Sequence, residues 1–269
     1  MTLNLDSVNA KLKRAEVHAQ SLTDEIMPWL QLNTYQLRQT VNADSTRYAI
    51  VAHVIGPEPP VEKWSLIVGD CLHNLRCALD HLVYAIAVHE SGMEPPPDAT
   101  SLMFLIADTK GEFIKSKRLQ SLSPAVQAAI ENVQPFNRPH PTLPSLLSVL
   151  ANLENVDKHR LVSLARSTIG HGDFSLSGHQ VDSSNQPEFS PFAADSLVDK
   201  AEVLTADFKR PAPGLKFDKI EVDSLIALVH KKKDPSDPSY TGQSESMTLL
   251  KQLIDEVRTV IAIVATAVK

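Results

Sequence analysis

The longest helical pattern in this chain lies between two proline-rich breaks. GPEPP at positions 56–60 precedes it, and Gly92 with MEPPPD follows it. Proline disrupts a helix interior, and residues 61–90 between the breaks contain none. This segment includes KWSLIVGDCLHNLRCALDHLVYAIAVHE. The pattern therefore predicts one long helix, which needs other elements to cover its apolar side.

Three further segments repeat apolar residues at spacings of three and four, the pattern of an amphipathic helix. Together with the long helix they predict a bundle over residues of about 5–32, 61–90, 145–158 and 246–268. Alternating and β-branched runs elsewhere predict an antiparallel sheet from residues of about 34–55 and 160–230, and Leu102 to Ile106 as a further short strand. Since the bundle draws on both chain ends, we expect one α+β domain over residues 1–269.

Composition excludes several classes of protein. Of the 269 residues, 43% are hydrophobic and 22% are charged, as in ordinary globular proteins. The net charge is −6, so any contact with nucleic acid must come from a local basic patch. The longest apolar run, VIAIVATAV, is too short to span a membrane. Cys71 and Cys77 are too far apart on one helix to pair, which favours reduced thiols and a cytoplasmic protein.

A helical wheel divides residues 61–90 into two sides. One side holds the apolar positions Leu72, Leu75, Leu79, Leu82, Val83 and Ile86. The opposite side is polar and holds Asp70, His73, Asn74, Cys77, Asp80, His81 and Tyr84, with Arg76 at the boundary. This polar stripe is almost free of lysine and glutamate, the usual residues of a solvated face. We expect it to meet another part of the chain, a partner or a ligand.

A second polar cluster ends the segment 145–158. Asp157, Lys158, His159 and Arg160 follow one another at the expected helix C-terminus. The helix dipole favours cations there, so capping alone accounts for the three basic residues. The alternative is that Asp157, His159 and Arg160 support a site on the polar stripe.

The spacing Arg76-x4-His81 resembles the R-x4–6-H motif of HEPN domains, helical-bundle proteins that include many metal-independent ribonucleases. The resemblance implies that Arg76 holds the scissile phosphate and that His81 is the general acid or base. It also implies a homodimer that acts on RNA without a cofactor, such as an endoribonuclease of a defence or toxin–antitoxin system. Supporting residues would be His73, Asn74, Cys77 and Asp80. The wider phrases GDCLHNLRCALDHL and LENVDKHRL are similar to those of uncharacterised bacterial proteins.

The same residues allow other functions. A non-catalytic interaction protein would use the stripe as a buried polar network, because buried polar side chains often only satisfy one another. A zinc-dependent hydrolase is a third possibility, with Asp70, His73, Cys77 and Asp80 as a row of ligands at helical spacing. Cys77 as a nucleophile, with His73 or His81 as its base, is a further reading. No phosphate loop, dinucleotide fingerprint or G-x-S-x-G motif is present.

Overall fold

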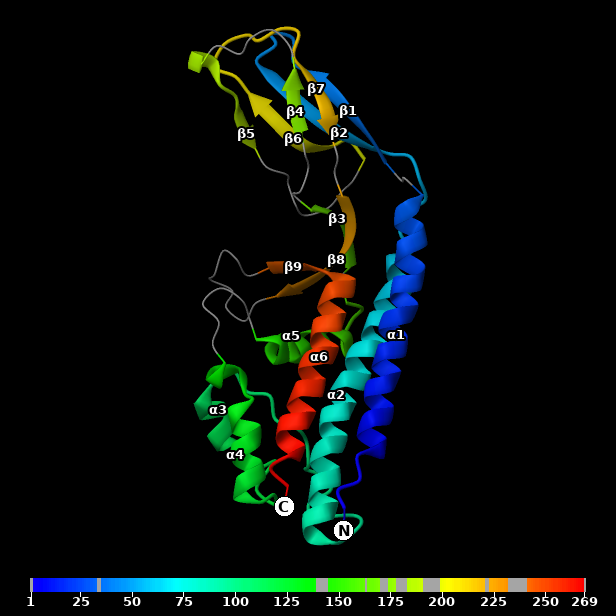
Figure 1. Cartoon of the computed structure of the whole chain (residues 1–269), viewed down its shortest axis with the longest axis vertical. Coiled ribbons are helices and arrows are strands. Elements are labelled where there is room, and N and C mark those ends of the chain that lie inside the picture. Colours follow the sequence, from blue (N-terminus) through cyan, green and yellow to red (C-terminus); the bar gives the residue numbers. More distant parts are fainter. Residues whose placement is uncertain are drawn as a thin grey trace. The chain divides into compact units, whose positions relative to one another are not determined.

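The structure of this chain is a computed structural model (Figure 1). The residues it describes are 2–32, 35–138, 145–162, 164–169, 174–177, 183–190, 199–220, 223–231 and 241–268. Parts of the region 160–230 predicted as sheet, among them residues 170–173, 178–182 and 191–198, lie outside the described residues.

Helices and strands alternate in blocks, so the chain is of the α+β class, as the sequence predicts. The described helices are α1 (Asp6–Gln31), α2 (Val61–Ser91), α3 (Lys110–Lys115), α4 (Pro124–Asn132), α5 (Leu146–Asp157) and α6 (Ser246–Ala265). The described strands are β1 (Tyr35–Val41), β2 (Arg47–Val54), β3 (Leu164–Ile169), β4 (Phe174–Ser177), β5 (Glu188–Ser190), β6 (Ala201–Asp207), β7 (Lys216–Ile220), β8 (Asp223–Lys231) and β9 (Thr241–Glu245). The four predicted bundle helices are confirmed as α1, α2, α5 and α6. The strand β9 falls in a stretch that its polar composition predicts as loop.

The chain divides into two compact units, and each draws on segments far apart in sequence. Unit 1 comprises residues 1–23, 62–163 and 228–269, and unit 2 comprises residues 24–61 and 164–227. The boundaries fall inside α1 and inside β8, so both elements continue from one unit into the other. That the chain is a single domain stays a prediction.

Unit 1 contains the predicted bundle. In Figure 1 the helices α1, α2 and α6 run side by side. The thiol of Cys71 on α2 donates a hydrogen bond to the carbonyl of Ala15 on α1 at 3.4 Å. Arg258 on α6 forms an ion pair with Glu16 on α1 at 2.8 Å. These contacts join helices from both chain ends in one unit.

Helix α2 is buried over most of its circumference. All six apolar residues assigned to its core side are fully buried: Leu72, Leu75, Leu79, Leu82, Val83 and Ile86. Small side chains beyond that side, such as Cys71 and Ala78, are buried as well. A helix that packs on several sides needs small residues where its neighbours approach closely. Helix α2 therefore packs against neighbouring elements on more than one side.

The short strand predicted for Leu102 to Ile106 is not present, and the segment that contains it, residues 102–107, is irregular. It has no regular secondary structure, and side chains rather than a neighbouring strand bind its backbone. Gln134, which is fully buried, accepts from the amide of Ala107 at 2.8 Å and donates to the carbonyl of Leu105 at 2.8 Å. Asp80 and Arg76 bind the backbone of Phe104. Apolar runs look alike in strands and in such buried segments, so only the partners distinguish them. We call residues 102–107 the strap.

Unit 2 is built on a four-stranded antiparallel sheet with the order β1-β2-β6-β5. In the same unit, the strands β4 and β7 form a two-stranded antiparallel sheet. Alternate residues of β2, namely Tyr48, Ile50 and Ala52, are buried on one face. Phe217 of β7 packs against both apolar clusters of that face. The prediction of an antiparallel sheet from the 34–55 and 160–230 regions is thus confirmed.

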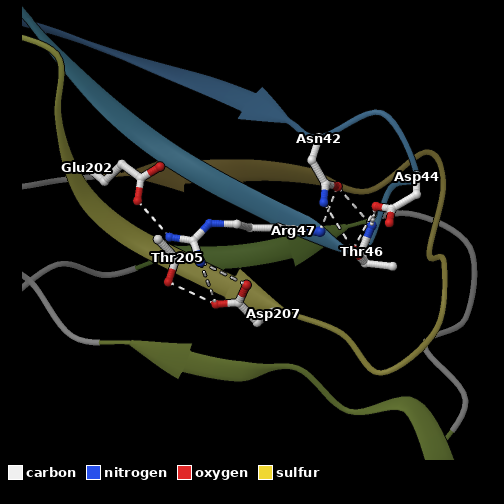
Figure 2. A network of polar contacts seen from close by, with 7 residues as sticks. All are labelled: Asn42, Asp44, Thr46, Arg47, Glu202, Thr205 and Asp207. Atoms are coloured by element: carbon white, nitrogen blue, oxygen red, sulfur yellow. Dashed lines mark hydrogen bonds and ion pairs between the residues drawn. The ribbon is translucent and has the colours of Figure 1, made fainter.

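A network of polar contacts joins β2, β6 and the β1–β2 turn (Figure 2). Arg47 on β2 forms ion pairs with Glu202 at 2.7 Å and with Asp207 at 3.2 Å, both on β6. In the turn before β2, the side chain of Asn42 accepts from the amides of Thr46 and Arg47 at 2.9 Å. The Asn42 contacts close the β1–β2 turn, and those of Arg47 connect β2 with β6 at an exposed surface.

None of the described helices has both the length and the apolar character that a membrane span requires.

Candidate functional site

The candidate site is the polar stripe of α2 together with the residues of α1 and α5 that lie near it, all in unit 1. The stripe is not uniform. Asp70 and His73 are exposed, while Cys77, Asp80 and His81 are half-buried. Asn74 is only 9% exposed, and its side chain donates to the carbonyl of Asp70 at 2.8 Å. The side chain of Asn74, predicted to support the site, thus forms its hydrogen bond within its own helix.

Arg76 and Asp80 together bind the backbone of Phe104 in the strap. Oδ1 of Asp80 accepts from the amide of Phe104 at 2.8 Å and from Nη2 of Arg76 at 3.1 Å. The same Nη2 donates to the carbonyl of Phe104. Phe104 itself is fully buried. The pair therefore satisfies both backbone groups of a residue that has no strand partner.

The pair is held in a poorly hydrated position. The side chain of Arg76 is 12% exposed and that of Asp80 is 27% exposed. Burial raises the pKa of the Asp80 carboxyl, and Arg76 opposes this rise. Nη2 of this guanidinium is thus committed to groups within the protein rather than to a ligand.

His81 is five residues after Arg76 on the same helix and is half-buried. The two side chains form no hydrogen bond with each other in the part of the chain that the structure describes. Arg76 is directed to the strap instead. Five residues span about 140° around a helix, which accounts for this separation. The structure therefore does not join the two residues that the HEPN resemblance pairs.

Asp157, the last residue of α5, lies against Gly69 of α2. A β-carbon placed on residue 69 would come within 2.3 Å of Oδ1 of Asp157. Burial raises the pKa of the Asp157 carboxyl, the carboxylates of Asp70 and Glu154 raise it further, and His73 acts in the opposite direction. The two polar clusters found in the sequence are therefore adjacent in space.

The rest of the second cluster is exposed. Lys158 forms an ion pair with Glu154 at 2.8 Å, and the side chain of Glu154 is only 9% exposed. Lys158 is the residue that caps α5, as its position at the helix end predicts. His159 and Arg160 follow it and are exposed to solvent. They lie outside the buried contacts of the stripe.

His73 and Cys77 are one helical turn apart and touch. Nε2 of His73 and Sγ of Cys77 are 3.4 Å apart. Burial raises the pKa of the Cys77 thiol; Lys11 on α1 and Arg76 lower it, while Asp80 and Glu154 raise it. The other cysteine, Cys71, is fully buried, and burial raises its pKa to about 12. Burial of Cys77 thus disfavours the thiolate form that a nucleophile needs.

Two residues of this region were not singled out by their sequence pattern. Gln134, which holds the strap, stands at the end of a short helix in ENVQPFN, where it resembles any polar loop residue. Gly69 lies in mid-helix, where a glycine is unfavourable. The sequence could have indicated Gly69 by this unfavourable position, because a mid-helix glycine often marks a close approach of another group.

The described residues contain no group of three or more His, Cys, Asp or Glu side chains arranged to hold a metal ion. In the predicted row of Asp70, His73, Cys77 and Asp80, the Asp80 carboxylate is committed to Arg76 and Phe104. The four-ligand zinc centre of a hydrolase therefore has no ready site within this part of the chain.

Comparisons of the chain with protein-family models, with curated proteins and with solved structures gave no match. The HEPN resemblance stays a prediction.

Proposed function

We propose that this chain is a non-catalytic interaction protein, in which the buried end of the α2 stripe holds the strap and the exposed end faces a partner. The observation that carries this proposal is the position of Arg76. Its side chain is 12% exposed and binds both Asp80 and the carbonyl of Phe104. Such an arginine stabilises the fold, and releasing it to bind a phosphate would leave Asp80 and a buried carbonyl unpaired.

A HEPN-like metal-independent endoribonuclease that acts on RNA, as part of a defence or toxin–antitoxin system, is the second candidate. The half-buried position of His81, on the same helix as Arg76, favours it. Histidine is the side chain that most often transfers protons as a general acid or base. In this alternative a homodimer would bring a second motif to the substrate and supply the geometry that one chain lacks.

RNA cleavage in the presence of EDTA separates the two candidates. The wild-type chain is compared with Arg76→Lys, Arg76→Ala and His81→Ala, each first tested for folding by circular dichroism and urea unfolding. Arg160→Ala and His159→Ala serve as matched controls, because they remove the same residue types from exposed positions.

If the chain is an interaction protein, we expect no cleavage by the wild-type chain. We also expect Arg76→Ala to be strongly destabilised and His81→Ala to fold normally. EDTA-resistant cleavage that is lost in folded Arg76→Lys and His81→Ala, but kept in both controls, would replace this proposal with the endoribonuclease.

We also propose a cytoplasmic location and a homodimer formed through the bundle. Both cysteines are free thiols, which suits a reducing compartment. Sedimentation velocity at two protein concentrations tests the dimer.

A further inference from the structure

His73 and Cys77 present two metal-binding atom types on one accessible face of α2. His73 is exposed and Cys77 is half-buried, so solvent reaches both. Their Nε2 and Sγ atoms are 3.4 Å apart. Residues four apart on a helix share a face, which is how helical metal sites commonly supply two ligands.

The distance between the two atoms matches the separation of two ligands on one tetrahedral ion. Zinc binds imidazole nitrogen at about 2.0–2.1 Å and thiolate sulfur at about 2.3 Å. At a tetrahedral angle these bonds place nitrogen and sulfur about 3.5 Å apart. No rearrangement of the helix is needed for both side chains to bind the same ion.

We propose that His73 and Cys77 form a two-residue chelating site for a zinc-like divalent ion, with water completing its coordination. The thiol of Cys77 loses its proton to solvent on binding, and the thiolate and the neutral imidazole each donate one lone pair. This site goes beyond the proposed function and does not depend on it, since neither Arg76 nor His81 is a ligand.

Charged groups of both signs surround the pair. The carboxylates of Asp80 and Glu154 act on Cys77, and the carboxyl of Asp157 lies near enough to His73 for the two to interact. Lys11 and Arg76 oppose them at Cys77. The carboxylates raise the pKa of the thiol, which disfavours a free thiolate nucleophile, whereas a bound divalent ion offsets their charge and deprotonates the thiol.

The structure leaves fewer ligands than the four zinc ligands that the sequence predicts on this face of α2. Asp80 binds Arg76 and the amide of Phe104, so it is not a ligand. Asp70 is exposed and lies three residues before His73 on the same helix. Because no third side chain among the described residues is in place, the site is open and its affinity is modest.

Cobalt(II) is the probe that tests this site, because a cobalt–thiolate bond gives a near-ultraviolet charge-transfer band. The full chain is titrated with cobalt under a phosphine reductant, and zinc is then added to displace it. We expect a saturable band with one ion per chain, lost on zinc addition, and release of about one proton per ion near neutral pH.

The variants assign the band to the two residues. His73→Ala and Cys77→Ser should each weaken cobalt binding at least tenfold, and Cys77→Ser should abolish the band. Cys71→Ala is the matched control, since Cys71 is the only other cysteine and is fully buried; His159→Ala controls for an exposed histidine. A band that survives in Cys77→Ser, or a wild-type chain that gives none, would overturn the proposal. Loss of binding in either control would do so as well.

Discussion

The carboxylate of Asp157 occupies the space that a side chain on residue 69 would need. The nearest of its oxygens lies 2.3 Å from the position of a β-carbon on Gly69. This contact joins the C-terminal end of α5 to the middle of α2, and it places Asp157 beside Asp70 and His73. It explains why a residue unfavourable in helices stands within the longest helix of the chain.

Gly69→Ala should therefore destabilise the protein. In an open helix position the change would stabilise by about 1 kcal/mol, but here overpacking against Asp157 costs about 1–3 kcal/mol. Urea unfolding measures the difference. In an Asp157→Ala background the same glycine change should become neutral or stabilising. If Gly69→Ala has the same effect in both backgrounds, the contact does not explain the glycine.

Arg76→Ala should cost about 3 kcal/mol of unfolding free energy, because it leaves the partly buried Asp80 carboxylate without its cation. Arg76→Lys should recover part of this loss, since a lysine can pair with Asp80 but reaches the Phe104 carbonyl less readily. The measurement is urea unfolding at neutral pH. An Arg76→Ala variant as stable as Arg160→Ala would show that the strap does not depend on this pair.

Gln134→Leu should destabilise unit 1 by about 3 kcal/mol. The glutamine binds the amide of Ala107 and the carbonyls of Leu105 and Ile130, all within 3.0 Å, and it is fully buried. Leucine fills a similar volume but leaves these backbone groups without their side-chain hydrogen bonds. A buried group left unsatisfied costs about 1–3 kcal/mol of unfolding free energy. Gln120→Leu, at an exposed position, is the control. Hydrogen exchange at Ala107 should accelerate in Gln134→Leu and stay unchanged in Gln120→Leu.

Asp157 should make the protein less stable as the pH rises. Its folded pKa is raised above the ordinary value of 3.8, so the folded chain holds the proton at a pH where the unfolded chain has lost it. Its favourable contribution is thus present below pH 3.8 and is lost as the pH rises through the folded pKa. The unfolding free energy of wild type relative to Asp157→Asn, measured in urea across pH, should fall over this window.

Asp44 provides a control of opposite sign for that experiment. Hydrogen bonds from Thr46 lower the pKa of its carboxyl below 3.8. The stability it contributes is present above 3.8 and is lost as the pH falls through its folded pKa. Wild type relative to Asp44→Asn should therefore gain stability with pH. The same slope for Asp157→Asn and Asp44→Asn would contradict the assignment.

Arg47 and its neighbour Tyr48 should differ in importance, although Arg47, whose contacts Figure 2 shows, makes more polar contacts. The side chain of Arg47 is 44% exposed, and solvated ion pairs contribute little. The hydroxyl of Tyr48 donates to the carbonyl of Ala212 at 2.6 Å in a residue that is 2% exposed. Tyr48→Phe should cost about 1 kcal/mol, and Arg47→Ala should cost less and lose its effect in high salt. A larger loss for Arg47→Ala in urea unfolding would reverse this ranking.

Periodicity within one segment could be predicted because it depends on neighbours in sequence. The bounds of α2 follow from the proline-rich breaks, and its fully buried core side follows from the spacing of leucines. The antiparallel strands β1 and β2 follow from alternation around a turn at Asn42 to Ser45. The candidate residues of the polar stripe were found in the same way, from the absence of lysine and glutamate.

What each polar side chain binds was decided only by the tertiary structure. Arg76 binds the carbonyl of a residue 28 positions later in the sequence. Asp157 fits against α2 because residue 69 of that helix is a glycine. The strap reads as a strand in sequence, yet its partners are Asp80, Arg76 and Gln134. Hydrogen bonds of this kind depend on which surfaces come into contact after the helices have packed. Residue type and local spacing do not determine those contacts.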